Sequence, residues 1–460
     1  MIRTAEGGHS HEFSMSHMLE FFSKAGSLFT KRGSFYGVEE TALSLFQKAW
    51  VVNRELTFKL LLFLRDIRGG AGNRSGAREC YRWLAYNDPT WLRVNLDWLV
   101  QVGRWDDLRC LFSTNLEYDA SYLWASAIIE GNVLAAKWAD RDDFPIRRWF
   151  NIKVGDFRRL LASIRKQHIV EHKMCSNTWN EVEYKTVPSV AMSRYTNAFK
   201  RHDEERFNTY KESLKRGETT VHAGVLFPHD CVRTVLHGDE EIGEAQFNAL
   251  PNYLKTDDRI IVISDTSGSM EVCVSGSVRA VHISQGMALY CSAKIPEDNP
   301  FHKKFIGFCS ESSFKNWNRL RFSEAVRNCE IFNGAVGSTR IDIALDLILE
   351  SARNWNLREE QLPTTLLIVS DMQFHQGCGS GDTEVERSLK KWDKYGYPRP
   401  KIVYWNTAGY PGSQDIAYSE GIGMVSGFSP AILSAIFSAE DFSPIGIMLR
   451  TIEKYKINIP

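Results

Sequence analysis

Apolar residues recur at helical spacing over the first half of the chain, from about Phe13 to about Lys215. Short segments rich in Gly, Asn, Asp and Pro interrupt this pattern and leave room for helices between them. The segments are RGGAGNR, NDPTW, GRWDD, EGN and RDDFP. The pattern predicts paired antiparallel helices stacked as an α-solenoid, although no repeat of fixed period is evident.

The pattern changes after about Leu250 to short β-rich runs that alternate with amphipathic stretches. The runs are RIIVISD (259–265), KKFIGFCS (303–310), TTLLIVSD (364–371) and KIVYWNT (401–407). Strands that alternate with helices in this way predict a parallel, doubly wound sheet. We therefore expect two domains, a helical-repeat domain over residues 1–250 and a sheet domain over residues 251–460.

Charge and composition narrow the classes of function. The 460 residues contain 56 Lys or Arg and 56 Asp or Glu, so any affinity for nucleic acid has to come from a local patch. Nine Cys without a CxxC pair argue against a disulfide framework and a Cys-rich zinc site. No apolar run reaches the ~18 residues of a membrane span, and the first residues lack the apolar centre of a signal peptide. We therefore expect a cytoplasmic protein.

Oxygen-bearing side chains follow two predicted strands and precede one predicted helix. Asp265, Ser267 and Ser269 follow the first strand, Asp371 ends another, and Thr339 precedes a helical stretch. Loops at the carboxyl ends of parallel strands meet at one edge of the sheet, where open α/β sheets bind ligands. Together these hydroxyls and carboxylates suit a small hard cation, Mg²⁺ or Mn²⁺. The alternative is that the hydroxyls cap the helices that follow.

The pattern D-x-S-x-S, followed by an isolated Thr and then an Asp, resembles the metal-ion-dependent adhesion site (MIDAS) of von Willebrand factor A domains. The resemblance implies that Ser267, Ser269 and Thr339 bind the metal through their hydroxyls. It also implies that Asp265 and Asp371 act directly or through water. All five positions of the pattern are present.

Several motifs of the helical half resemble the helical module shared by telomerase-associated, Ro and vault proteins (the TROVE module), especially a largely uncharacterised branch with this two-part layout. They are RDIRGGAGNR, VGRWDDL, AAKWADR and VPSVAMSRYTNAFKRHDEERFNTY. The closing KIVYWNTAG…GIGMVSGFSPAILSAIF is similar to the last strand and helix of the Ro autoantigen's A domain. In Ro, HEAT-like repeats close into a ring that binds small structured RNAs outside and the ends of misfolded RNAs in its hole. The resemblance implies a helical-repeat ring or arch followed by a von Willebrand A-like domain.

A basic stretch supports RNA binding without reference to any family. Residues 147–173 contain eight Lys or Arg against two acids, a net charge of +6 in a neutral chain. Trp149 and Phe150 lie within it, as aromatic residues that can stack on bases. The alternative is a solvated basic face with these aromatics in the core. The candidate RNA-binding residues are Arg147, Arg148, Lys153, Arg158, Arg159, Arg165 and Lys166.

Two further motifs carry weaker signals. HIVEH (168–172) fits the H-x-x-E-H pattern of inverted zinc proteases, but no third-ligand motif follows it. Arg65, Asp66 and Arg68 beside three glycines suggest phosphate binding, yet the glycines fit neither a P-loop nor G-x-G-x-x-G. We therefore expect a helix end with a structural Arg–Asp pair at that point.

These patterns favour a non-enzymatic RNA-binding protein, a ribonucleoprotein component that holds small structured or misfolded RNA and carries a Mg²⁺ site on its sheet domain. The alternative is a metal-dependent protein–protein interaction scaffold without RNA, in which the metal accepts a carboxylate from a partner protein. A metal-dependent hydrolase is a weaker reading, because it needs a general base and a water near the metal.

Overall fold

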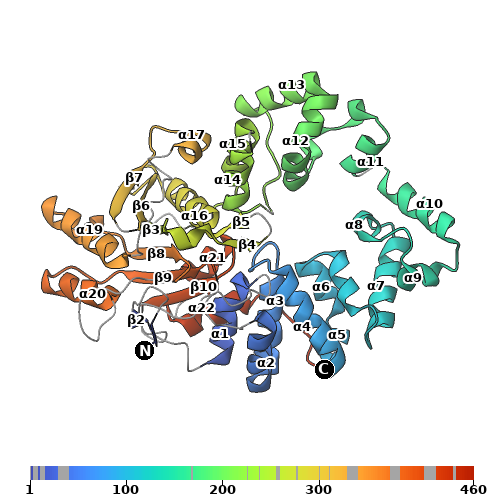
Figure 1. Cartoon of the computed structure of the whole chain (residues 1–460), viewed down its shortest axis with the longest axis horizontal. Helices are drawn as coiled ribbons and strands as arrows, with labels where there is room; N and C mark the ends of the chain where they lie inside the picture. Colours follow the sequence, from blue (N-terminus) through green and yellow to red (C-terminus); the bar gives the residue numbers. More distant parts are fainter. Residues whose placement is uncertain are drawn as a thin grey trace.

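The structure is a computed structural model of the chain. It describes residues 2–3, 9–10, 16–28, 41–166, 169–224, 226–237, 239–254, 259–275, 278–299, 301–309, 311–328, 340–372, 384–408, 421–438 and 442–460. Figure 1 shows a curved row of helices, blue to green, beside a sheet flanked by helices, yellow to red. A helical part followed by a mostly parallel sheet with helices confirms the expected fold class.

The helical part forms an arch (Figure 1). Asn53 and Asn73 begin two of its helices by accepting hydrogen bonds from backbone N–H groups of the first turn, as Asn does at helix starts. Short two-stranded pairing between β1 (Ile2–Arg3) and β2 (His9–Ser10) precedes the helices. The helical elements are α1 (His17–Lys24), η1 (Ala25–Ser27), α2 (Ala42–Val52), α3 (Arg54–Arg65), α4 (Arg74–Asn87), α5 (Pro89–Arg93), α6 (Leu96–Val102), η2 (Trp105–Leu111), α7 (Glu117–Ile129), α8 (Val133–Trp138), α9 (Phe144–Arg147), η3 (Arg148–Phe150), α10 (Val154–Arg165), α11 (Val170–Cys175), η4 (Trp179–Glu181), η5 (Tyr184–Thr186), α12 (Ser189–His202), α13 (Glu204–Lys215), α14 (Pro228–Leu236) and α15 (Glu240–Asn248).

The sheet part begins at β3. Its six-stranded sheet has the order β10-β9-β8-β3-β6-β7, and all neighbouring pairs are parallel except β6 with β7. The elements are β3 (Ile260–Asp265), η6 (Gly268–Glu271), β4 (Cys273–Ser275), β5 (Val278–Arg279), α16 (Ala280–Lys294), β6 (Lys304–Phe308), β7 (Ser312–Asn316), α17 (Phe322–Arg327), α19 (Ile341–Asn354), η7 (Glu359–Gln361), β8 (Thr365–Ser370), α20 (Glu384–Lys394), β9 (Lys401–Asn406), β10 (Ile422–Ser426), α21 (Ala431–Ser438) and α22 (Pro444–Ile452).

The four strands expected from the apolar runs are present as β3, β6, β8 and β9. Every residue of β3 and of β8 is buried, so both faces of the sheet are covered at its centre. A parallel strand that is buried on both faces needs apolar residues at consecutive positions, which explains the uninterrupted runs. The antiparallel edge strand β7 was not expected, because its sequence SSFKN is short and largely polar.

The first end of the arch is fixed to the last strands of the sheet. Ser426 donates a hydrogen bond to the carbonyl of Phe22 at 2.9 Å, and Ser27 donates one to the carbonyl of Asn406 at 2.6 Å. Gly427, at a φ of +110°, lies so close to Ala71 that a Cβ there would meet the Ala71 Cα at 2.7 Å. The backbone of the sheet part therefore contacts the arch directly.

The segment that ends the described chain strengthens the same junction. Asp66, directly after α3, accepts hydrogen bonds from Lys454 at 3.0 Å and from the Tyr455 hydroxyl at 2.8 Å. Asn95 and Asn458 exchange two hydrogen bonds of 2.8 Å. The C-terminal residues thus lie along the arch, in agreement with the position of the C-terminus in Figure 1.

The second end of the arch, α14 and α15, packs against helices α16 and α17 of the sheet part. Gly286 of α16 lies against His229 of α14, where an added Cβ would lie 2.8 Å from the backbone nitrogen of His229. Phe247 of α15 stacks on Phe322 of α17 with 3.9 Å between the ring centroids. The arch is therefore joined to the sheet part at both of its ends (Figure 1).

The arch consists of two limbs with different hydrophobic cores. The core of the first limb (α2–α10) includes Phe157 and Leu161 and is continuous with the core of the sheet part. In the second limb (α11–α15), a separate cluster that includes Tyr184 lies beneath α12, α13 and the start of α15. The buried residues of α14, such as Val232, and Phe247 of α15 belong instead to the core shared with the sheet part. An ion pair of 2.9 Å joins Lys137 of α8 to Glu171 of α11 across the seam.

Among the described residues, no helix is both long and apolar enough to cross a membrane.

Candidate functional site

Asp265 and Asp371 meet at the carboxyl edge of the sheet. Asp265 is the last residue of β3, and Asp371 directly follows β8, which pairs with β3 in parallel. Both residues have no exposed surface. Ser370 donates a hydrogen bond of 2.6 Å to one oxygen of Asp265, and the N–H of Ser267 donates one of 2.9 Å to the other. The strand ends thus hold the carboxyl group of Asp265 in one orientation.

The two serines of the predicted metal site lie in the loop after β3. The hydroxyl oxygens of Ser267 and Ser269 are 3.1 Å apart. Ser267 occupies the N-cap position of η6, yet its side chain makes no capping hydrogen bond there. Thr266 fixes the start of the loop by donating a backbone and a side-chain hydrogen bond to the carbonyl of Phe308 on β6. The Ser267 hydroxyl therefore lies beside that of Ser269 and does not cap the helix.

Four of the five predicted ligands are therefore brought together, namely Asp265, Ser267, Ser269 and Asp371. Thr339 lies outside the described residues. The next residue, Arg340, donates its backbone N–H to the carbonyl of Cys309 at 3.2 Å, directly after β6. The segment that follows Thr339 thus starts at the same edge of the sheet.

The electrostatics of this edge favour a cation. Burial and then the carboxylate of Asp371 raise the pKa of Asp265 to about 7, although hydrogen bonds from Ser370 and Ser267 oppose the shift. Two carboxylates side by side repel each other, and a metal ion between them removes that repulsion. Carboxylates and hydroxyls are hard oxygen donors of the kind that Mg²⁺ and Mn²⁺ prefer. The described part of the chain contains no group of three or more His, Cys, Asp or Glu that could hold a metal ion, so this donor set depends on hydroxyls beside its two carboxylates. The residues present fit a small hard cation.

The predicted basic stretch begins at the end of α9, continues over η3 and α10 and ends on α11, and its charges are partly balanced. Arg158 pairs with Asp142 at 2.7 Å and Arg159 with Asp156 at 2.5 Å. Arg165 donates to the carbonyl of Leu161, and burial lowers its pKa. Lys153, Arg158, Arg159 and Lys166 are exposed. The positive charge of this region is smaller than the +6 of residues 147–173 suggests, because Asp142, which pairs with Arg158, lies outside those residues.

Exposed aromatic rings lie beside the first two arginines of this stretch. Tyr118 and Tyr122 of α7 are 64% and 55% exposed and contact the Trp149 ring edge-on, with centroid distances of 4.7 and 5.0 Å. Arg148 lies 5.8 Å from the centroid of the same ring. We call the six residues of this region the aromatic–arginine surface: Tyr118, Tyr122, Phe144, Arg147, Arg148 and Trp149.

The rest of the aromatic–arginine surface repeats this arrangement. Phe144 is 60% exposed, and the guanidinium of Arg147 lies 5.7 Å from its ring centroid. Arg148 and Trp149 are both fixed by hydrogen bonds of 3.0 Å to the hydroxyl of Ser121. Neither the two tyrosines nor Phe144 was predicted from the sequence, although Tyr118 and Tyr122 are spaced one helical turn apart.

The two weaker motifs have structural roles where they are described. Glu171 of HIVEH pairs with Lys137 and accepts a hydrogen bond from Tyr195, and His168 lies outside the described residues. Arg65, at the end of α3, forms a fully buried pair of 2.7 Å with Asp107. A structural Arg–Asp pair is therefore present at this helix end, but its acid is Asp107, and Asp66 of the motif pairs with Lys454 instead.

Comparisons with known proteins give relatives without an assigned activity. Residues 259–450 match a domain of unknown function (DUF7788), and residues 4–108 and 153–264 match another (DUF2828). An uncharacterised protein of Acanthamoeba polyphaga mimivirus is 25% identical over 482 residues, which cover 90% of this chain and 82% of that protein. The crystal structure of the Deinococcus radiodurans Ro (RSR) protein is similar over 96% of this chain and 99% of that one, at 13% identity and a TM-score of 0.49.

Proposed function

We propose that the chain is an RNA-binding protein and that single-stranded RNA stacks on the aromatic–arginine surface. The observation that carries the proposal is the exposure of Tyr118, Tyr122 and Phe144 beside two arginines. Unpaired bases stack on exposed aromatic rings, and guanidinium groups bind phosphate while they stack on the same rings. The small structured RNA implied by the resemblance to the Ro-type module has the same chemistry in its loops and tails.

Stacking is the main source of affinity in this proposal. Arg158 and Arg159 of α10 each have a carboxylate partner, so an RNA phosphate has to compete for them. Arg147 has no carboxylate partner among the described residues, and Arg148 has a partly exposed one, Glu117, at 3.2 Å. We therefore place the centre of the RNA site on α7, α9 and η3, with α10 contributing at its edge.

The sheet part carries a separate proposed site for Mg²⁺ or Mn²⁺. Asp265, Ser267, Ser269 and Asp371 would hold the ion, and the MIDAS resemblance adds Thr339. The bound ion would supply a positive charge able to accept a carboxylate from a protein partner. Ser370 and Ser267 keep the carboxyl group of Asp265 oriented toward the edge by their hydrogen bonds.

A metal-dependent interaction scaffold without RNA is the second candidate function. The two buried carboxylates beside the Ser267 and Ser269 hydroxyls favour this function, because all four residues lie in the sheet part and would bind a metal without RNA on the arch. In this case the arch would position partner proteins and the aromatic–arginine surface would bind no base. The two functions differ in a direct observation, which is whether RNA binds to the purified full chain.

The test is fluorescence anisotropy with a structured RNA that carries a single-stranded tail. Replacing Tyr118 and Tyr122 together by Ala is expected to weaken binding by roughly tenfold to a hundredfold, since stacking contributes about 1–3 kcal/mol per base. Trp355→Ala is the matched control, because Trp355 is 68% exposed in the sheet part, directly after α19. Equal binding by both variants would show that the surface is wrong. No binding by the unmodified chain would favour the scaffold.

A further inference from the structure

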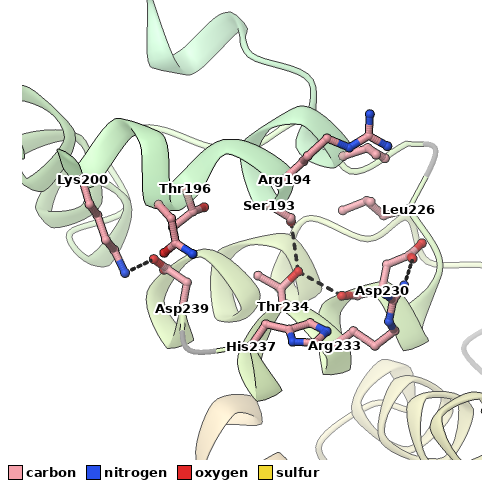
Figure 2. Close-up of a pocket in the computed structure, with 12 residues that line it drawn as sticks. Ser193, Arg194, Thr196, Lys200, Leu226, Asp230, Arg233, Thr234, His237 and Asp239 are labelled. Carbon is pink, nitrogen blue, oxygen red and sulfur yellow. Dashed lines mark hydrogen bonds and ion pairs between the residues drawn. The ribbon is translucent and has the colours of Figure 1, made fainter. Parts of the chain in front are cut away.

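The second limb of the arch contains a pocket that neither proposed site uses. It has a volume of about 330 Å³ and lies between α12, α14 and the start of α15. Figure 2 shows side chains from these helices pointing toward one another across it. A pocket of this size is at the lower end of the range for small-molecule sites and suits a ligand the size of one nucleotide.

The floor of the pocket is a fixed network of hydroxyl groups. Buried Gln246 donates a hydrogen bond of 2.8 Å to the hydroxyl of Ser193, which lies 3.0 Å from the hydroxyl of Thr234. Thr234 donates its own proton to the carbonyl of Asp230. These protons are already directed within the protein, so the floor holds α12 against α14 and sets the spacing of the charged groups above it.

The charged groups around the pocket are mainly cationic. Arg194, Lys200 and Arg233 face two carboxylates, Asp230 and Asp239. Both carboxylates are engaged at helix starts, because Asp230 accepts from the N–H of Phe227 and Asp239 from that of Ile242, each at 3.0 Å. The acids therefore stay in place, and an anion would compete with them for Lys200 and Arg233.

The cations differ in how firmly they are held. Lys200 pairs with Asp239 at 3.0 Å, and Arg233 lies 4.0 Å from Asp230 (Figure 2). Arg194 is exposed on the rim and forms no ion pair with any described carboxylate. Its planar guanidinium can bind two oxygens of one anion at once, which makes it the first group that an incoming anion would meet.

We propose that this pocket binds a phosphate monoester, either on a free mononucleotide or at the 5′ end of an RNA. A terminal phosphate carries close to two negative charges at neutral pH and three strong acceptor oxygens, which match a rim of several cations better than a diester does. Val190 and Leu226 give one wall an apolar surface for the attached sugar or base. The pocket shares no residue with the aromatic–arginine surface, so the proposal does not depend on RNA binding there.

The first experiment is isothermal titration calorimetry of the full chain with adenosine 5′-monophosphate and with adenosine. The monophosphate is expected to bind and adenosine is not, because the rim recognises the phosphate. Arg194→Gln should weaken monophosphate binding at least about tenfold, the usual loss for one charge-assisted contact. Arg201→Gln is the matched control, since Arg201 is exposed on the same helix and does not line the pocket, and it should change the affinity less than twofold.

The second experiment separates the two sources of phosphate. Short RNAs with a 5′-phosphate or a 5′-hydroxyl are compared in the variant with Ala at positions 118 and 122, which removes the other proposed surface. A preference for the 5′-phosphate that Arg194→Gln abolishes identifies an RNA end. Equal affinity of the two RNAs, with monophosphate binding intact, identifies a free nucleotide. Failure of both phosphate probes to bind, or equal effects of Arg194→Gln and Arg201→Gln, overturns the proposal.

Discussion

The arch and the carboxyl edge of the sheet differ in the neighbours of their buried carboxylates. In the arch, buried Asp107 is bonded to the guanidinium groups of Arg65 and Arg78 at 2.7 to 2.8 Å, so opposite charges compensate one another. At the sheet edge, Asp265 and Asp371 place like charges side by side. The first arrangement stabilises the fold by itself, whereas the second is suited to a ligand of opposite charge. Internal compensation thus distinguishes a structural charge cluster from a candidate site.

The largest effect is expected from breaking the compensated cluster. Asp107→Ala leaves Arg65 buried without its carboxylate and should reduce the free energy of unfolding by about 3–5 kcal/mol. Urea denaturation of the full chain measures the loss, and added Mg²⁺ should not restore it. Asp156→Ala, which removes an exposed pair with Arg159, is the control and should cost at most ~1 kcal/mol. A small loss for Asp107→Ala would show that the cluster contributes little.

The next effect concerns the like charges at the sheet edge. Mg²⁺ should raise the stability of the unmodified chain, by about 2.7 kcal/mol at a hundredfold excess over its Kd. Asp265→Asn should abolish this gain while it removes the repulsion with Asp371. Thermal melting with EDTA and with Mg²⁺ measures both, and Asp298→Asn at an exposed position is the control. Equal melting temperatures of the unmodified chain in the two buffers, or a preference for Zn²⁺, would remove the metal proposal.

A smaller effect distinguishes the two groups of arginines within the basic stretch. Replacing Arg147 and Arg148 together by Gln should flatten the slope of log affinity against log salt by about 1.4, if each contacts a phosphate of single-stranded RNA. The same change at Arg158 and Arg159 should flatten it less, because both already have carboxylate partners. Filter binding at several salt concentrations gives the slopes. The reverse order would place the RNA on α10, and an equal loss in Asp265→Asn would place it on the sheet part.

The smallest effect is a pH dependence at the junction of the arch and the sheet part. Burial opposes ionisation of Asp66, but Lys454 and two backbone N–H groups outweigh it and lower the pKa of Asp66 below 3.8. The contribution of Asp66 is therefore complete above its unfolded pKa and is lost as pH falls through the lower folded one. Asp66→Asn should reduce stability at pH 7 and make little difference near pH ~2. Urea midpoints across this range measure it, and a pH-independent difference would contradict it.

The sequence predicted which residues meet at the sheet edge better than which residues meet on the surface of the arch, for a physical reason. Asp265 and Asp371 end strands whose apolar runs are unmistakable, and parallel strands bring their carboxyl ends together. No such rule connects Tyr118 of α7 with Trp149 of η3, because helix packing decides which faces meet. The partner of Arg158 is equally hidden, since Asp142 lies 16 positions earlier in the chain.

The boundary between the two domains, expected at residues 250 and 251, stays a prediction, as do the RNA-binding residues and the role of Thr339. The structure nevertheless changes how such a boundary is understood. The N-terminal helix α1 contacts β10, and the C-terminal residues lie along α3 and α6. Sequence patterns give the order of the elements along the chain. They do not show that the first helix packs on the sheet part or that the last residues pack on the arch.

The contact between the two limbs is the weakest connection described within the arch. Each limb is joined to the sheet part at its own end, and among the described residues the cluster beneath α12 and α13 is separate from the core of the first limb. Across the seam, the pair between Lys137 and Glu171 is partly exposed, so its rupture costs little free energy. We therefore expect the contact between α8 and α11 to separate at a lower free-energy cost than the unfolding of either limb.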